Sequence, residues 1–90
     1  MTSLAEMREA HLREMREHYS QVSKMKLGTS DGQEALRTYD RYKTWLGWLA
    51  FTNAHPVAIV GAMELLGRAK ERLREVLGSE EILEFFLGQE

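Results

Sequence analysis

Two histidines are the side chains best suited to chemistry at neutral pH in this sequence. His11 and His18 stand seven residues apart in a stretch predicted to be helical, with Glu14 between them. Seven residues of α-helix rise about 10 Å, so the two imidazoles cannot easily bind one metal ion together. Nor is there the Glu-x-x-His pattern of di-iron bundles, because Arg8 and Met15 occupy the positions three before each histidine. We expect a hydrogen-bonded histidine pair in a buried seam; the alternatives are a pH-sensitive seam and a metal site.

A run of aromatic residues offers a binding surface rather than a reactive group. Aromatic residues recur at every third position between 39 and 51: Tyr39, Tyr42, Trp45, Trp48 and Phe51. An α-helix turns about 100° per residue, so this series winds through about 240° instead of forming one stripe. A helix that packs on its own domain along one face has no structural need for large aromatic side chains on its other faces. The series therefore predicts an additional surface for another helix or for a partner.

Trp48 is the most informative member of the series. It falls about 150° from the centre of the helix's main apolar face, beside Arg37 and Arg41. One possibility is that a C-terminal helix carrying Ile82 and Phe85 folds over it. A second is that it anchors a protein partner, most simply another copy, because Trp and Arg are enriched at interface hot spots. A third is stacking on unpaired nucleic-acid bases. The predicted partner contacts are Tyr42, Trp45 and Trp48, with Arg37 and Arg41 orienting the partner.

Basic residues cluster further along the chain. Arg68, Lys70, Arg72 and Arg74 lie within seven residues, divided by acidic residues such as Glu71. We expect a solvated face with salt bridges; the alternative is a ridge on which Arg68 and Arg72 contact phosphates.

The sequence carries no catalytic or cofactor signature. It contains no cysteine, which excludes a disulfide, a thiolate zinc site and a cysteine nucleophile. No Gly-rich phosphate loop and no Ser-His-Asp set is evident. The net charge of −2, from 14 acidic and 12 basic residues, gives no global attraction to nucleic acid or anionic lipid. We therefore expect no enzyme activity, no cofactor and no metal.

One stretch requires a test for membrane insertion. Between residues 44 and 63 the only titratable side chain that can carry a charge near neutral pH is His55. Residues 52–56 break this window into halves shorter than the roughly 20 residues of a membrane-spanning helix. A buried helical hairpin, and no membrane association, is the prediction. Glu6 and Arg8 follow the initial Met closely, which is unlike a signal peptide and predicts a cytoplasmic protein.

Capping and turn signals predict helices over residues 3–26, 31–53, 56–77 and 80–87. Capping boxes begin at Ser3 and Ser30, Pro56 suits a first helical turn, and Gly78 followed by Ser79 ends one helix and caps another. The third segment carries an apolar seam of Ile59, Ala62, Leu66, Ala69, Leu73 and Val76. Because the loops are short, we predict one all-α domain over residues 1–90, an antiparallel three-helix bundle with a short fourth C-terminal helix.

These features together predict a non-catalytic helical protein–protein interaction module that self-associates or serves as a small subunit of a larger assembly. The alternative is a nucleic-acid-associated small helical subunit of a ribonucleoprotein effector complex. The latter depends on analogy at the level of the fold.

Overall fold

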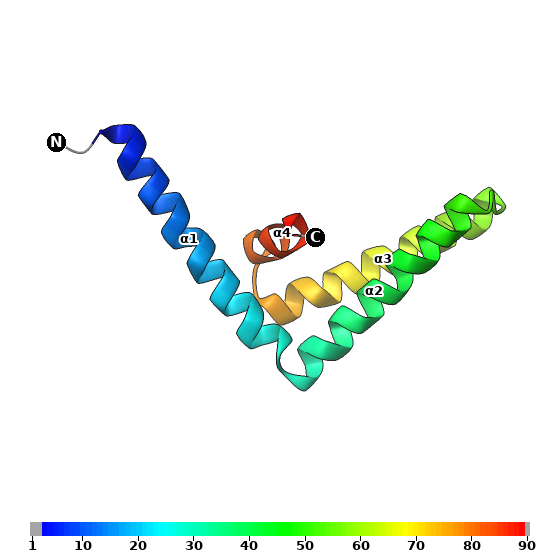
Figure 1. Ribbon diagram of the computed structural model, residues 1–90. Helices are drawn as coiled ribbons and strands as arrows, with labels where there is room; N and C mark the ends of the chain where they lie inside the picture. Colours follow the sequence, from blue (N-terminus) through cyan, green and yellow to red (C-terminus); the bar gives the residue numbers. More distant parts are fainter. Residues whose placement is uncertain (1–2, 90) are drawn as a thin grey trace.

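The computed structural model describes residues 3–89, and this part of the chain is all-α (Figure 1). Its helices are α1 (Leu4–Leu27), α2 (Ser30–Phe51), α3 (Pro56–Leu77) and α4 (Glu80–Gly88). The predicted helix boundaries are confirmed to within two residues. No strand is present among the described residues. The predicted helix-boundary roles of four residues are also confirmed: Ser3, Pro56, Gly78 and Ser79.

The turn between α1 and α2 differs from the prediction by one residue. Thr29, rather than Ser30, is the N-cap of α2, and its Oγ1 accepts a hydrogen bond from the Gly32 backbone N–H at 3.0 Å. Thr29 Oγ1 also donates to the Lys26 carbonyl at 2.7 Å, which ties the cap to the last turn of α1. The predicted capping box was placed one residue late because adjacent Thr and Ser are both good N-cap residues.

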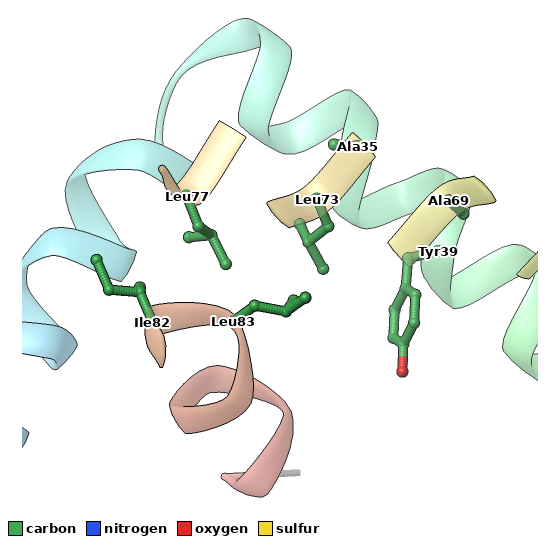
Figure 2. Close-up of a cluster of buried hydrophobic side chains, with 7 residues drawn as sticks. All are labelled: Ala35, Tyr39, Ala69, Leu73, Leu77, Ile82 and Leu83. Atoms are coloured by element: carbon green, nitrogen blue, oxygen red, sulfur yellow. The ribbon is translucent and has the colours of Figure 1, made fainter. Parts of the chain in front are cut away.

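Helices α2 and α3 lie side by side and form a helical hairpin (Figure 1). The predicted apolar seam of α3 is confirmed, because every one of its residues is buried or half-buried. At the open end of the hairpin, a cluster of buried side chains joins it to α4 (Figure 2). The cluster consists of Ala35, Tyr39, Ala69, Leu73, Leu77, Ile82 and Leu83. The core therefore sits at one end of the hairpin, where α2, α3 and α4 meet.

Helix α1 diverges from the hairpin, so that the molecule has the outline of a V with α4 between its two limbs (Figure 1). The Cα radius of gyration is 16.9 Å, against about 12 Å for a compact domain of this length. Only the second half of α1 contacts the core, through half-buried Tyr19, Val22 and Leu27. The predicted arrangement, with α1 packed along the hairpin, is not seen within one chain. Helix α4 takes the place beside the core that α1 would have filled.

Candidate partner-binding surface

The closed end of the α2–α3 hairpin carries large apolar side chains that the chain leaves exposed. We call residues 44–63 the tip. Six of its apolar side chains are between 41% and 86% exposed: Trp45, Trp48, Phe51, Val57, Val60 and Met63. Only Leu49 and Ala62 of the tip are buried. The tip contains no Asp, Glu, Lys or Arg. Large exposed apolar side chains gathered on one uncharged segment are typical of an interaction site.

The exposed side chains are distributed around the hairpin rather than on one face. On α2, Trp48 and Phe51 lie about 150° from the direction of α3. On α3, Val57 and Val60 lie about 150° from the direction of α2. Helices that are apolar all round are normally buried in larger structures. The tip therefore exposes apolar side chains on the outer faces of both helices.

The structure places the predicted contact residues at this surface to different degrees. Trp48 is 59% exposed, and Trp45 is exposed beside Tyr42, with ring centroids 6.5 Å apart. Tyr42 is half-buried and packs against the core, so only part of its ring is available. Arg37 and Arg41 are exposed on α2, on the core side of the tip. Trp45 and Trp48 are thus the residues of the predicted set that lie on the tip itself.

Helix α4 does not cover Trp48. Its buried residues, Ile82 and Leu83, pack in the cluster with Leu73 and Leu77 at the opposite end of the hairpin (Figure 2). Of the three possibilities for this tryptophan, coverage by the C-terminal helix is therefore excluded. The connection between α3 and α4 is too short to carry α4 to the tip: it consists of Gly78, at φ 91°, and Ser79.

The apex of the hairpin is polar, and its backbone is well satisfied. Thr52 Oγ1 donates to the Trp48 carbonyl at 3.0 Å, and His55 Nδ1 accepts from the Val57 N–H at 3.1 Å. Asn53 has a positive φ of 55°, a conformation that Asn tolerates better than most residues. The apolar side chains therefore form a belt below a rigid, polar apex. An apex of this kind suits a protein socket better than the hydrocarbon of a bilayer, where unpaired polar groups are costly.

Charged residues border the tip on the side of the core. We call the charged residues of segments 37–43 and 64–72 the collar. It holds six basic and three acidic residues, a net charge of +3 in a chain whose total is −2. The set is Arg37, Asp40, Arg41, Lys43, Glu64, Arg68, Lys70, Glu71 and Arg72. The border of the tip is therefore more basic than the chain as a whole.

The basic residues of α3 are engaged with acidic neighbours. Arg72 Nη1 lies 3.6 Å from Glu75 Oε2, and Arg74 Nε donates to Glu71 Oε2 at 2.8 Å. The hydrogen bond from Arg74 holds the pKa of the Glu71 carboxyl below its usual value. Arg68 is exposed. These pairs support the solvated, salt-bridged face; the predicted phosphate contacts of Arg68 and Arg72 stay a prediction.

The histidines do not form the buried seam that was expected. Both His11 and His18 are exposed on α1. The helix turns a different face to the rest of the chain, centred on Tyr19, whose ring packs on Phe85 at 5.8 Å between centroids. Tyr19 Oη also donates to Glu81 Oε2 at 3.2 Å. Partial loss of solvent, followed by this hydrogen bond and the Glu81 charge, raises the pKa of Tyr19.

Within residues 3–89, no group of three or more His, Asp or Glu side chains is arranged to hold a metal ion. No helix in this part of the chain has the length and apolar character needed to cross a membrane. No protein-family model, curated protein or solved structure matches the chain. The function must therefore be argued from the surface.

Sequence reasoning missed three members of the tip, Val57, Val60 and Met63; it named Phe51 in the aromatic series but not among the partner contacts. The available signal was the charge-free window of residues 44–63, which was interpreted as a buried hairpin. The hairpin is confirmed, but its predicted burial is wrong for this end, because these side chains lie outside the seam between α2 and α3 and are exposed. A charge-free window predicts equally a hairpin end that is buried by its own chain and one that is exposed. The positions of α1 and α4, which leave the tip uncovered, decide between these two structures.

Proposed function

We propose that the chain is a non-catalytic protein–protein interaction module, which self-associates or serves as a small subunit of a larger assembly, and that the tip is its contact surface. The observation that carries this proposal is the belt of six exposed apolar side chains on a hairpin end without a charged residue. Trp45 and Trp48 are the expected hot spots, and Arg37 and Arg41 of the collar orient the partner. A cytoplasmic location stays a prediction.

The test removes Trp48 from the tip. Because Trp48 is 59% exposed, Trp48→Ala should leave the melting temperature of the monomer nearly unchanged, within about 0.5 kcal/mol of stability. Loss of a hot-spot tryptophan costs about 2–4 kcal/mol of binding, or roughly 30-fold to 1000-fold in affinity. Met25→Ala is the matched control, because Met25 is an apolar side chain 74% exposed on α1, outside the tip.

Association would be measured by sedimentation of the purified chain and by co-purification of tagged chain from the cells that encode it. The expected result is an association, with itself or with another protein, that Trp48→Ala abolishes and Met25→Ala preserves. The proposal is overturned if wild-type chain associates with no protein in either measurement. It is also overturned if the association survives Trp48→Ala, or if the tip binds lipid vesicles in place of a protein.

A further inference from the structure

We infer that the chain forms a reciprocal dimer in which the free N-terminal part of α1 from each copy packs on the tip of the other. This inference depends on the proposed function and names the partner of the tip: a second copy, contributing a defined segment. We call residues 3–14 the arm.

The arm is the second surface of the chain that lacks a packing partner. Every residue from 3 to 14 is exposed, including Leu4 at 85%, Met7 at 57% and Leu12 at 41%. An isolated helix of about 12–15 residues is marginal in water, because nucleation is costly and no tertiary contact offsets it. The arm continues the packed second half of α1 and so needs no separate nucleation, but its exposed apolar side chains contribute stability only if a partner covers them.

The arm and the tip cannot meet within one chain. They lie at the far ends of the two limbs of the V, in a molecule 60 Å long (Figure 1). Two copies can satisfy both surfaces at once if each arm covers the other copy's tip. Such an exchange is isologous and closes at two subunits, so it leaves no unpaired copy of either surface.

This dimer would also reconcile the sequence pattern with the V shape. The helix lengths and short loops predict a third helix packed on the α2–α3 hairpin. In the reciprocal dimer, α1 of the second copy supplies that helix, and the antiparallel three-helix bundle is built between chains. The turn at Gly28 and Thr29 directs α1 outward, as the hinge of an exchanged element does.

Charge and area are both compatible with the exchange. The arm has three acidic and two basic residues, a net charge of −1, opposite in sign to the collar at +3. The exposed parts of the three tip aromatics amount to roughly 400 Å² per copy. Two tips and the matching area on two arms give roughly 1,600 Å², within the range of stable protein interfaces.

The experiment uses the two tryptophans as a reporter. Trp45 and Trp48 are the only tryptophans in the chain, and both lie on the tip. We would compare full-length wild type with Met7→Glu in the arm and with Met25→Glu, which makes the same exposed Met-to-Glu change on α1 beyond the arm. Sedimentation gives the dimer constant, and tryptophan emission shows whether the tip is covered.

Wild type and Met25→Glu should form a dimer whose tryptophan emission shifts to shorter wavelength with increasing concentration. Met7→Glu should raise the dissociation constant at least roughly tenfold and keep the emission of solvent-exposed tryptophan. Because Met7 is 57% exposed, Met7→Glu should leave the monomer folded, and a cooperative thermal melt followed by circular dichroism checks this for both variants. The inference is overturned if Met7→Glu dimerises like wild type with the same emission, a result that leaves the tip as a contact surface intact. A chain that is monomeric at all concentrations overturns the arm exchange, while a Trp48-dependent foreign partner would still support the proposed function.

Discussion

Gly32 offers the sharpest test of how α1 is held at the base of the V. A Cβ at this position would lie 2.0 Å from the Lys26 carbonyl oxygen and 2.7 Å from Leu27 Cα. Both atoms belong to the backbone of the last turn of α1, so they cannot move aside as a flexible side chain would. Gly32→Ala must therefore push the end of α1 away from α2.

Two effects of Gly32→Ala oppose each other. Alanine in a helix is favoured over glycine by about 1 kcal/mol. Overpacking against backbone costs about 1–3 kcal/mol, and the overlap at 2.0 Å places this site at the upper end. We therefore expect a net loss of about 1–2 kcal/mol, which lowers the melting temperature by roughly 4–16 °C in a domain of this size.

Gly67→Ala is the matched control for this prediction. Gly67 lies within α3, and a Cβ there would meet nothing within 4 Å. Only the helix-propensity gain then remains, so Gly67→Ala should raise the melting temperature, by about 0.5–1 kcal/mol of stability. Thermal melts followed by circular dichroism measure both variants. If Gly32→Ala stabilises the chain as Gly67→Ala does, the close approach of α1 and α2 described above is not present in solution.

Three further predictions concern the core, the α1–α4 contact and nucleic acid. Leu73 is fully buried in the cluster of Figure 2, so Leu73→Ala should cost about 2–5 kcal/mol in a denaturant melt; a loss below about 1 kcal/mol would contradict the packing described. The raised pKa of Tyr19 contributes stability below the unfolded value of about 10, and this stability is lost as pH rises through the folded pKa. Tyr19→Phe should therefore melt with less dependence on pH above 10 than wild type, and an unchanged alkaline profile would refute the assignment. Reversing Arg68 and Arg72 to Glu changes the collar from +3 to −1, so it should weaken an association through the tip without abolishing it, and single-stranded RNA should not bind the wild-type chain in a filter assay at moderate salt; steeply salt-dependent RNA binding lost in that variant would instead support the ribonucleoprotein alternative.

The helices could be predicted from the sequence because their signals are local. Ser3, Pro56 and Gly78 mark boundaries through hydrogen bonds and backbone conformations that involve only a few neighbouring residues. The apolar seam of α3, ending near Leu73 and Val76, is likewise set by the period of one helix. The Thr29 cap was missed by one residue because neighbouring Thr and Ser compete for the same role.

The arrangement of the helices could not be predicted in the same way. The direction of α1 depends on the close approach at Gly32 and on the contact between Tyr19 and Phe85, which joins segments far apart in the sequence. His11 and His18 lie on an apolar-looking stripe, yet Tyr19 turns an adjacent face toward α4. Trp48 was correctly placed away from the main face of α2. Whether Trp48 is covered depends on where α4 packs. The hydrophobic periodicity of a single helix does not predict that position.

We propose that the tip is where this chain binds protein. The most direct measurement is quenching of Trp45 and Trp48 fluorescence by acrylamide over a dilution series, for the chain alone and with any protein that co-purifies with it. A complex with a dissociation constant of about 1 μM has a binding free energy of about 8 kcal/mol. At roughly 100 μM the protein concentration is far above that constant, so most of the chain is in the complex. We predict that both tryptophans become protected from the quencher as the complex forms. Tryptophans that stay equally accessible while sedimentation shows a complex, or a chain that forms no complex at all, would contradict the claim.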